Sequence, residues 1–339
     1  MKKLLAMALA CLMLAGILSG CANAPGDEKV EYRWKMALNS TEGDNAYDTG
    51  VLFAQKIKEL TDGRVQVDLY GGAQLGTTAE VLEGMYAGVA DVMCESIGTL
   101  ATFTPLANIE AMPYMFSSYD HFMNVWYSDL GQEIKDAVGD DAGFKLMGAS
   151  YRGPRVVCAT KALRTIEDFK GFKLRAPNLE MYLKTWQWAG ANPTPVPMNE
   201  VYTALQQKTV EGQENPLPAI DAASVQEVQK YVSMWNANYD CLFFCINGDI
   251  YNSMTPEQQE VIDECGRLAT QYEREINRAG DDEIMNRWQN ENGVTITNYE
   301  DMDINSFKQA VDGVDEWYQK ELEGQGYDDA KELIDTFIK

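Results

Sequence analysis

Hydrophobic residues recur along the chain at two alternating spacings. Residues 32–38 (YRWKMAL) and 65–70 (VQVDLY) are typical of strands, in which successive side chains point to opposite faces. Between them, residues 44–61 place their apolar side chains near one face of a helix. A chain that alternates strands and helices in this way builds a mainly parallel sheet covered by helices on both faces. The pattern therefore predicts an α/β fold.

The same alternation continues through most of the chain. Further strands are predicted at residues 90–96, 171–177, 209–216 and 240–247, and helices at 79–85, 119–138, 179–188 and 200–206. Residues 143–160 (GFKLMGASYRGPRVVCAT) predict two strands joined at a turn that contains glycine and proline. The segment from residue 293 to the end of the chain adds a strand and two more helices.

One predicted helix, at residues 255–289, is far longer than a usual globular helix. It begins with Thr255, Pro256 and Glu257, which suits an N-cap followed by a proline in the first turn. We expect a helix of this length to contact both domains.

The N-terminus has the pattern of an export signal. Two lysines precede an uninterrupted apolar run at residues 4–17, which is too short to span a bilayer well. The run leads to the string Leu-Ser-Gly-Cys that ends at Cys21, and this string resembles the lipobox of bacterial lipoproteins, in which the cysteine is acylated as the new N-terminus. We therefore expect a signal peptide at residues 1–20, a lipid on Cys21 and a polar linker at 21–30. The 319 residues that remain suggest about two domains.

The charge balance argues against two classes of partner. The chain carries 28 lysines and arginines against 52 aspartates and glutamates, which gives a formal net charge of -24. Nucleic acids and anionic lipid surfaces both bind clustered basic side chains, so we expect neither as a partner. Because no second hydrophobic run of membrane-spanning length follows the signal, the mature chain should be water-soluble apart from its lipid.

The cysteines are predicted to be small buried side chains. Seven occur, and five remain once Cys11 leaves with the signal and Cys21 carries the lipid. An odd number of cysteines cannot all pair. Cys241 and Cys245 share a strand face but would lie roughly 13 Å apart, whereas a disulfide needs Cα atoms within about 7 Å. We therefore expect no bond between these two and buried thiols at all five positions.

The sequence carries no catalytic or metal-binding signal. Its single histidine, His121, lies within a helical pattern, and one histidine does not supply a histidine-rich zinc site. No G-x-S-x-G, P-loop or G-x-G-x-x-G motif is present, so hydrolase, nucleotide-binding and dinucleotide-binding interpretations lack support. We expect no metal, no cofactor and no enzymatic activity, and we interpret His121 as a partly buried helix residue.

Three stretches of the chain resemble a known receptor family. They are YGGAQLGTTAEVLEGMYAG at residues 70–88, FKGFKLRAPN at 169–178 and GANPTPVPMNEVYTALQQKTVEGQENPL at 190–217. Together they look like the solute-binding subunit of tripartite ATP-independent periplasmic (TRAP) transporters, the DctP-like proteins, and the likeness runs from about residue 32 to the C-terminus. The lipobox fits this resemblance, because an exported receptor without a periplasm to confine it needs a tether.

The resemblance implies a two-domain architecture. In that family two α/β domains, each built from discontinuous segments, close around a ligand like a flytrap, and a long helix runs across both. One domain would take residues 29–152 plus 241–280, and the other would take 153–240 plus 281–339. The partners implied are a small organic acid and the TRAP membrane permease subunits, with an extracytoplasmic, lipid-anchored location. We expect the receptor to be a monomer.

The resemblance also implies a carboxylate site. The arginine that forms a bidentate pair with a ligand carboxylate in the family falls on Arg175 of GFKLRAPN. A second arginine, which braces the carboxylate, falls on Arg155, with Arg152 as the alternative if the turn is shifted, and an asparagine hydrogen-bonded to the carboxylate falls on Asn215. A planar guanidinium can grip a carboxylate with two parallel hydrogen bonds. Charges more than about 8 to 10 Å away are screened, so the acidic chain can still bind an anion.

Residues of the other domain are implied to face the far end of the ligand. Asn39 and Glu95 match such positions, and Met198 stands where the family often has an aromatic wall, so a softer apolar contact is expected there. Glu95 would repel a second carboxylate and would accept hydrogen bonds from sugar hydroxyls. We therefore expect a hydroxylated monocarboxylate, such as a uronate or an aldonate. Sialic acid binders tend to carry charged residues where this chain has Thr78 and Gly98.

Several alternatives remain open at this stage. One alternative ligand is a C4-dicarboxylate, and another is a sialic acid. Glu95 could pair with an arginine instead of a ligand hydroxyl. Asn215 could serve as a turn residue before Pro216 instead of a ligand contact. A protein of another class, an exported enzyme that acts on a similar acid with carboxylates alone, is the rival interpretation. A sensor partner in place of a transporter receptor is a third.

Overall fold

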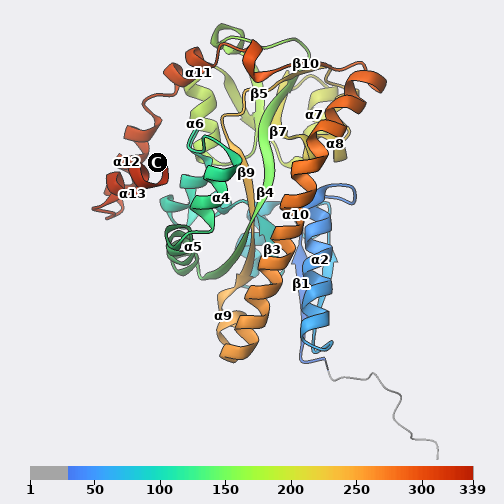
Figure 1. The fold of residues 1–339 in the computed structure, drawn as a ribbon, viewed down its shortest axis with the longest axis vertical. Helices are drawn as coiled ribbons and strands as arrows, with labels where there is room; N and C mark the ends of the chain where they lie inside the picture. Colours follow the sequence, from blue (N-terminus) through green and yellow to red (C-terminus); the bar gives the residue numbers. More distant parts are fainter. Residues whose placement is uncertain (1–29, 339) are drawn as a thin grey trace, which may run out of the picture.

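The computed structural model describes residues 30–338, except for the side chains at 277–279 and 338. The predicted signal peptide, most of the linker and Cys21 lie outside the described residues. Within them, strands and helices form two lobes around a shared ten-stranded sheet, with one lobe above the other (Figure 1). The α/β fold predicted from the alternating pattern is confirmed.

The first lobe, the lower one in Figure 1, contains the N-terminal strands. In this lobe β2 (Val65–Tyr70), β1 (Tyr32–Ala37) and β3 (Val92–Glu95) lie in that order and run parallel. The next two strands, β9 (Tyr239–Asn247) and the first half of β4 (Phe144–Ala159), are each antiparallel to their neighbour. The sheet is therefore mixed rather than mainly parallel, because β4 and β9 form antiparallel pairs at its centre.

The second lobe continues the sheet from the other half of β4. There β7 (Gly212–Pro216) pairs antiparallel with β4, β5 (Lys173–Ala176) pairs parallel with β7, and β6 (Asn192–Pro195) forms the edge. Beside this path, the short strand β8 (Tyr231–Ser233) pairs with β4, and β10 (Thr295–Thr297) pairs with β8. The strand β4 thus belongs to both lobes.

The segment predicted as two strands joined at a turn is one continuous strand, β4. Its pairing with β9 shifts in register between Met147 and Ser150 and again between Tyr151 and Gly153. Gly148 and Gly153 adopt φ values of 74° and 96°, a region that glycine enters without a steric penalty. The predicted turn is wrong because bulges absorb the glycine and proline while the strand continues.

The first long helix, α2 (Asn45–Leu60), covers one face of the first lobe. Asp44 caps its N-terminus and accepts a hydrogen bond from the Ala46 N–H at 2.9 Å. Of its predicted apolar stripe, Phe53 and Ile57 are fully buried and Tyr47, Val51 and Ala54 are partly buried. The Phe53 ring stacks on Phe244 of β9 with ring centroids 4.1 Å apart. The helix therefore covers the sheet from β1 to β9 on this face.

The long helix predicted at residues 255–289 is α10 (Pro256–Glu291). Thr255 and Gln258 form a capping box at its start, and Pro256 occupies the first turn. Cys265 lies in the hydrophobic core of the first lobe and Trp288 in that of the second. The helix runs along both lobes (Figure 1), so the predicted contact with both is confirmed.

Shorter helices cover the remaining sheet faces. Those within residues 30–338 are α3 (Thr78–Met85), α4 (Tyr119–Trp126), α5 (Asp129–Ala142), α6 (Glu180–Trp188), α7 (Val201–Gln206), α8 (Leu217–Ala222), α9 (Gly248–Asn252), α11 (Ile304–Ala310), α12 (Val314–Gly324) and α13 (Ala330–Ile338). The single helix predicted at 119–138 is divided into α4 and α5, because Ser128 caps a new helix and accepts a hydrogen bond from the Gly131 N–H.

The last two helices pack against the first lobe. The Tyr318 hydroxyl in α12 donates to the Leu106 carbonyl oxygen at 2.9 Å. In α13, the Phe337 ring lies 5.4 Å from that of Trp126, in an edge-to-face contact. These contacts join the C-terminal segment to the first core cluster. The predicted division into 29–152 plus 241–280 and 153–240 plus 281–339 stays a prediction.

The described cysteines are all buried and free of disulfide bonds, as the spacing predicts. They are Cys94, Cys158, Cys241, Cys245 and Cys265.

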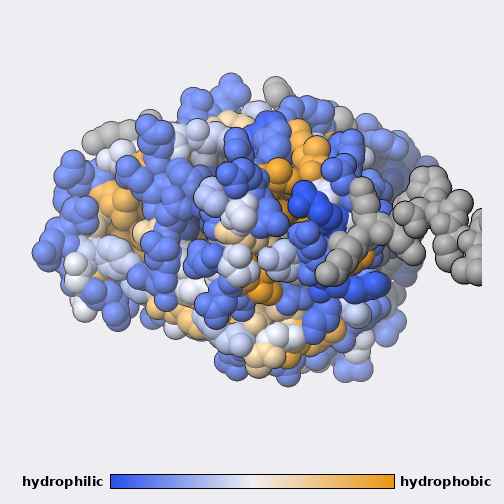
Figure 2. Space-filling view, turned by 90° about the horizontal axis from the view of Figure 1, so that it is seen from below, coloured by the Kyte–Doolittle hydropathy of each residue, from blue (hydrophilic) through white to orange (hydrophobic). Residues whose placement is uncertain are grey.

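The surface reflects the acidic composition. Figure 2 shows that hydrophilic residues cover most of the face seen from below, and that apolar residues gather only in separate patches. Across residues 30–338, no helix combines the length and the apolar character needed to cross a membrane.

Candidate ligand-binding site

The parallel strands of the two lobes, β1 to β3 in the first and β5 to β7 in the second, point their carboxyl ends at one another. β3 and β4 run in the same direction because both are antiparallel to β9. β7 runs against β4, and β5 is parallel to β7 (Figure 1). Ligands of open α/β sheets bind outside the carboxyl ends of strands. Asn39 and Glu95 from the first lobe and Arg175 and Asn215 from the second therefore lie near strand ends that face the same region.

Arg175 carries a buried guanidinium that pairs with no carboxylate of residues 30–338. The residue is 3% exposed, its Nε donates to the Val196 carbonyl oxygen at 2.9 Å, and its Nη1 has no hydrogen-bond partner among the described residues. Burial lowers the pKa of Arg175 to about 10, an effect that Glu214 opposes and Arg155 reinforces. The group stays charged at neutral pH and keeps a donor available, which a bound carboxylate would satisfy.

Arg155 lies beside this site, but carboxylates of the chain already occupy most of its donors. Its Nε donates to Glu214 at 2.5 Å, its Nη1 to Asp240 at 2.5 Å and its Nη2 to the Asn215 Oδ1 at 3.0 Å. The guanidinium also lies over the Tyr182 ring, 4.7 Å from the centroid. Burial opposes the charged form, yet Glu214 and Asp240 raise the pKa of Arg155 well above its usual value. Its contact with a ligand carboxylate stays a prediction.

Arg152, the alternative to Arg155, is engaged with the first lobe. Its Nη2 lies 2.9 Å from Asp44 Oδ2, and its Nη1 lies 3.1 Å from Asp240 Oδ2. Although burial opposes the charged form, Asp44 and Asp240 raise the pKa of Arg152. Among the described residues Glu95 forms no salt bridge with an arginine, although the charge of Arg152 is near enough to affect the pKa of Glu95.

A continuous series of buried ion pairs links the two lobes. In order, its members are Asp44, Arg152, Asp240, Arg155 and Glu214. The series begins at the N-terminus of α2 and ends on β7, the strand that pairs with β5. When Arg175 is included, three arginines stand beside three carboxylates and the formal charges cancel. These six groups therefore add no net charge to the site, and Glu95 contributes a further negative charge on the first-lobe side.

Asn215 lies within β7, so its interpretation as a turn residue is wrong. Its Oδ1 accepts from Arg155, and its Nδ2 donates to the Gln213 Oε1 at 2.9 Å. The same Nδ2 lies 3.5 Å from the sulfur of Met198. The structure thus brings Asn215, Arg155 and Met198 together, as the resemblance implies, and adds Gln213 to the group.

Asn39 organises a second polar group in the first lobe. Its Nδ2 donates to the Glu95 Oε1 at 2.7 Å and also to the Thr78 hydroxyl oxygen. Both amide hydrogens are then used. The Asn39 Oδ1 and those lone pairs of the Glu95 carboxylate that Asn39 and the Ser96 N–H do not occupy remain as acceptors. Burial raises the pKa of Glu95 to about 6, although Arg152 and the Asn39 hydrogen bond oppose the shift. This group therefore presents mainly acceptors, whereas Arg175 presents donors.

Another carboxyl group lies buried behind Glu95. Glu110 accepts hydrogen bonds from the Ser96 hydroxyl at 2.6 Å and from the Gly98 N–H at 3.2 Å. Burial raises the pKa of Glu110 to about 8, because these two hydrogen bonds compensate only part of the lost hydration. The group is mainly protonated at neutral pH and adds little negative charge to the region.

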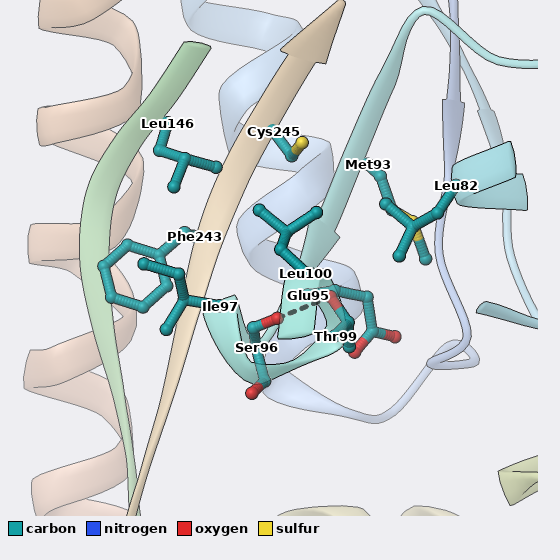
Figure 3. Close-up of a pocket in the computed structure, with 10 residues that line it drawn as sticks. All are labelled: Leu82, Met93, Glu95, Ser96, Ile97, Thr99, Leu100, Leu146, Phe243 and Cys245. Atoms are coloured by element: carbon teal, nitrogen blue, oxygen red, sulfur yellow. Dashed lines mark hydrogen bonds between the residues drawn. The ribbon is translucent and has the colours of Figure 1, made fainter. Parts of the chain in front are cut away.

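A small pocket lies beside Glu95 in the first lobe (Figure 3). Its polar lining consists of Glu95, Ser96 and Thr99, and the Thr99 hydroxyl donates to the Ser96 carbonyl oxygen at 2.7 Å, the dashed line in Figure 3. The apolar lining comes from Leu82, Met93, Ile97, Leu100, Leu146, Phe243 and Cys245. Arg175 does not line this pocket, which therefore adjoins only the first-lobe part of the candidate site.

His121 has the structural role predicted for it. It lies in α4, is partly buried, and accepts a hydrogen bond at Nδ1 from the Ser117 N–H at 3.2 Å. Among the described residues, no cluster of three or more histidine, cysteine, aspartate or glutamate side chains is placed to hold a metal ion.

Asp240, Glu214 and Gln213 belong to the site although motif reasoning did not single them out. Gln213 and Glu214 stand inside the quoted GQENP string, next to Asn215. Asp240 is an acidic residue near the start of an otherwise apolar strand, and it is 1% exposed. A charged residue in a mostly apolar strand indicates a buried ion pair, since a buried carboxylate requires a partner.

Known proteins resemble this chain over most of its length. The model of the family described as bacterial extracellular solute-binding protein, family 7 (DctP) matches residues 36–321. The sialic acid-binding periplasmic protein SiaP of Vibrio cholerae is 28% identical over 277 residues, which are 82% of this chain and 85% of that protein.

Two solved structures extend the comparison to the fold. A TRAP periplasmic solute-binding protein from Roseobacter denitrificans, with bound L-galactonate, has a TM-score of 0.80 at 24% identity and covers 91% of this chain and 99% of its own. One from Xanthobacter autotrophicus Py2, with bound β-D-galacturonate, has a TM-score of 0.83 at 23% identity and covers 90% and 99%. The two-lobed fold is that of these receptors.

Proposed function

The chain belongs to the bacterial extracellular solute-binding protein family 7, and we propose on that basis that it is the solute-binding subunit of a TRAP transporter. It captures an organic acid outside the cytoplasm and delivers it to the membrane permease subunits. Capture involves closure of the two lobes about the strands that join them, a hinge motion of the kind common in binding proteins.

The observation that carries this proposal is the buried guanidinium of Arg175. Its Nη1 lacks a hydrogen-bond partner within the described part of the chain, and its pKa of about 10 keeps it charged. Charged hydrogen bonds contribute about 1.5 to 3 kcal/mol each, and a bidentate pair adds directionality. A ligand carboxylate completes this site, with Asn215 as a further donor and Arg155 bracing the group from the other side of β7.

The proposed ligand is a hydroxylated monocarboxylate, a uronate or an aldonate. The acceptors of Asn39 and Glu95 favour hydroxyl donors at the far end, and Met198 offers an apolar contact. The two receptors of the same fold hold L-galactonate and β-D-galacturonate, which are sugar acids.

Two other ligand classes of the same family are the runners-up. A C4-dicarboxylate would place a second negative charge near Glu95, which disfavours it. A sialic acid has support from the 28% identical relative in Vibrio cholerae. However, Thr78 and Gly98 bring no charge to the far end of the site, which favours the smaller sugar acids.

We also propose that the receptor is tethered to the membrane by lipid on Cys21 and works as a monomer. The support for the tether is the lipobox-like string after the apolar run at residues 4–17. Adjacent genes for a large and a small membrane subunit would distinguish a transporter receptor from a sensor partner.

A thermal-shift screen over carboxylic acids tests the proposal. We expect one or more sugar acids to raise the melting temperature of the pure protein, and the response to be lost in Arg175→Ala and strongly reduced in Arg175→Lys. Arg164→Ala is the matched control, because Arg164 is an exposed arginine of the same lobe. A full ligand response in Arg175→Ala would refute the assigned role.

The same samples decide between a receptor and an exported enzyme. Any acid that raises the melting temperature is incubated with the protein, released by denaturation and identified by mass spectrometry. Recovery of unchanged acid supports the receptor, whereas turnover of the acid supports the enzyme.

A further inference from the structure

Gln213 occupies the centre of the second-lobe site without any exposure to solvent. The residue is 0% exposed and lies on β7 between two strands. Arg175 of β5 is its register partner on one side and Cys158 of β4 on the other. Burial of an amide beside a buried guanidinium costs desolvation free energy, which only hydrogen bonds to the amide can offset.

The direction of the Gln213 amide follows from its neighbours. The Arg155 guanidinium has only donors, so the atom of Asn215 that faces it must be the oxygen. The Asn215 nitrogen then faces Gln213, which must present its own oxygen, and the 2.9 Å contact joins these two atoms. The hydrogen bonds of this series therefore run in one direction: Arg155 donates to Asn215, and Asn215 donates to Gln213.

One end of this series is not satisfied by a hydrogen bond. The Gln213 Nε2 has no hydrogen-bond partner among the described residues, and the neighbouring Cys158 thiol, which interacts with the Gln213 side chain, is at best a weak acceptor. An apolar residue of similar volume, such as methionine, would avoid the unsatisfied amide. Packing alone thus gives no reason for glutamine at this position.

Gln213 leaves Asn215 with one N–H to spare. One Nδ2 hydrogen goes to the Gln213 oxygen, and the other faces the sulfur of Met198 at 3.5 Å. A thioether sulfur is a weak acceptor, and a carboxylate oxygen is a much stronger one. The second hydrogen is therefore available to a ligand that displaces the contact with Met198.

We propose that Gln213 is a positioning residue of the binding site, which holds the Asn215 amide with its second N–H directed at the ligand carboxylate. This inference rests on the proposed function, because it requires a carboxylate ligand. Gln213 does not itself contact the ligand. It acts through Asn215, so its effect on affinity depends on the presence of the Asn215 side chain.

The test is a double-mutant cycle on ligand affinity. D-galacturonate, L-galactonate, succinate and N-acetylneuraminate are titrated by calorimetry into the full mature chain and into Gln213→Met, Asn215→Ala and the double variant. For each acid that binds the parent protein, we expect Gln213→Met to weaken binding roughly tenfold, the worth of one hydrogen bond. The double variant should bind no more weakly than Asn215→Ala alone.

Gln229→Met is the matched control. Gln229 is another buried glutamine of the second lobe with both amide atoms lacking hydrogen-bond partners in the described structure, and it makes no hydrogen bond to Asn215. We expect its affinity to equal that of the parent protein. We also expect Gln213→Met to melt at the parent temperature or higher, because it removes an unsatisfied buried amide.

The positioning role is overturned if Gln213→Met binds the acids within twofold of the parent protein. It is also overturned if Gln213→Met weakens binding by the same factor in the Asn215→Ala background as in the parent. If Arg175→Ala abolishes binding while Gln213→Met does not alter it, only this inference fails. If none of the four acids binds the parent protein, the proposed function fails with it.

Discussion

Arg155 and Asp240 are in contact where β4 and β9 lie side by side between the lobes, with Nη1 2.5 Å from Oδ1. Arg152 approaches the other oxygen of the same carboxylate at 3.1 Å. Ion pairs between one carboxylate and two buried arginines add little net stability to the fold, since all three groups lose hydration. Removal of the carboxylate is nevertheless strongly destabilising, because it leaves two buried positive charges without a partner.

The first prediction concerns this shared carboxylate. Asp240→Asn keeps the side-chain volume but removes the charge between Arg152 and Arg155. We expect the free energy of unfolding to fall by about 3 to 5 kcal/mol, measured by urea denaturation. Asp68→Asn is the control, because Asp68 pairs with Arg33 on the surface and should cost at most about 1 kcal/mol. An equal decrease in the free energy of unfolding of the two variants would show that Asp240 does not balance the charges of Arg152 and Arg155.

The second prediction concerns the pH dependence of stability at Glu110. Burial raises the pKa of this carboxyl to about 8 in the folded protein, against about 4.3 in an unfolded chain. The folded state therefore binds a proton that the unfolded state releases between these two values. The stability contributed by the protonated group is complete below about pH 4, and it is lost as pH rises toward 8.

Glu110→Gln removes this dependence while it keeps an acceptor for Ser96 and Gly98. We expect the parent protein to lose stability relative to this variant by up to about 1.4 kcal/mol per pH unit between pH 5 and pH 8. Chemical denaturation of both proteins at unit pH intervals measures the difference. Parallel pH profiles would mean that Glu110 has an ordinary pKa in the folded protein.

The fold was largely predictable because its elements follow local patterns. The apolar stripe of α2, the alternation in β1 and β2 and the cap at Thr255 each depend on residues close in sequence. The predicted turn within β4 failed for the opposite reason. Whether a glycine and a proline end a strand or form a bulge depends on the partner strand, here β9, almost a hundred residues away in the chain.

The site was only partly predictable for a related reason. Arg175, Asn215 and Met198 stand in recognisable strings. Asn215 contacts Met198, and Arg175 lies on the strand next to that of Asn215 because β5 and β7 are neighbours. The partners of Arg155 were not foreseen. Asp240 reaches it from β9, and only the pairing of β9 with β4 brings the two residues together. A sequence motif indicates which residues bind the ligand, but the pairing of distant strands determines which carboxylates form ion pairs with the arginines.

The third prediction concerns the membrane tether. Cys21→Ser removes the thiol that a lipid would modify but leaves the proposed export signal at residues 1–20 unchanged. We expect the parent protein to fractionate with membranes and the variant to appear in the soluble extracytoplasmic fraction, with the same ligand response. Metabolic labelling with a fatty acid provides a direct measurement. The same fractionation of both proteins would rule out an anchor at this cysteine.

The fourth prediction concerns ligand selectivity at Glu95. Its Oε1 accepts from Asn39 at 2.7 Å, and its carboxylate, to which the Ser96 N–H also donates, keeps further lone pairs for a ligand hydroxyl. Glu95→Gln keeps the shape but removes the negative charge. We expect affinity for D-galacturonate to fall by roughly three- to tenfold, because a neutral acceptor is weaker than a charged one. Affinity for succinate should rise, because the repulsion between carboxylates disappears.

The ratio of the two affinities separates this role from a general loss of function. Glu83→Gln, at an exposed glutamate of α3 in the same lobe, makes the same change of net charge away from the site and should leave the ratio unchanged. Calorimetric titration of both acids into the three proteins gives the ratio directly. If Glu95→Gln weakens both acids equally, Glu95 supports the fold of the site but does not select the ligand. A reversal of preference toward succinate would identify the charge of Glu95 as the feature that favours hydroxylated monocarboxylates.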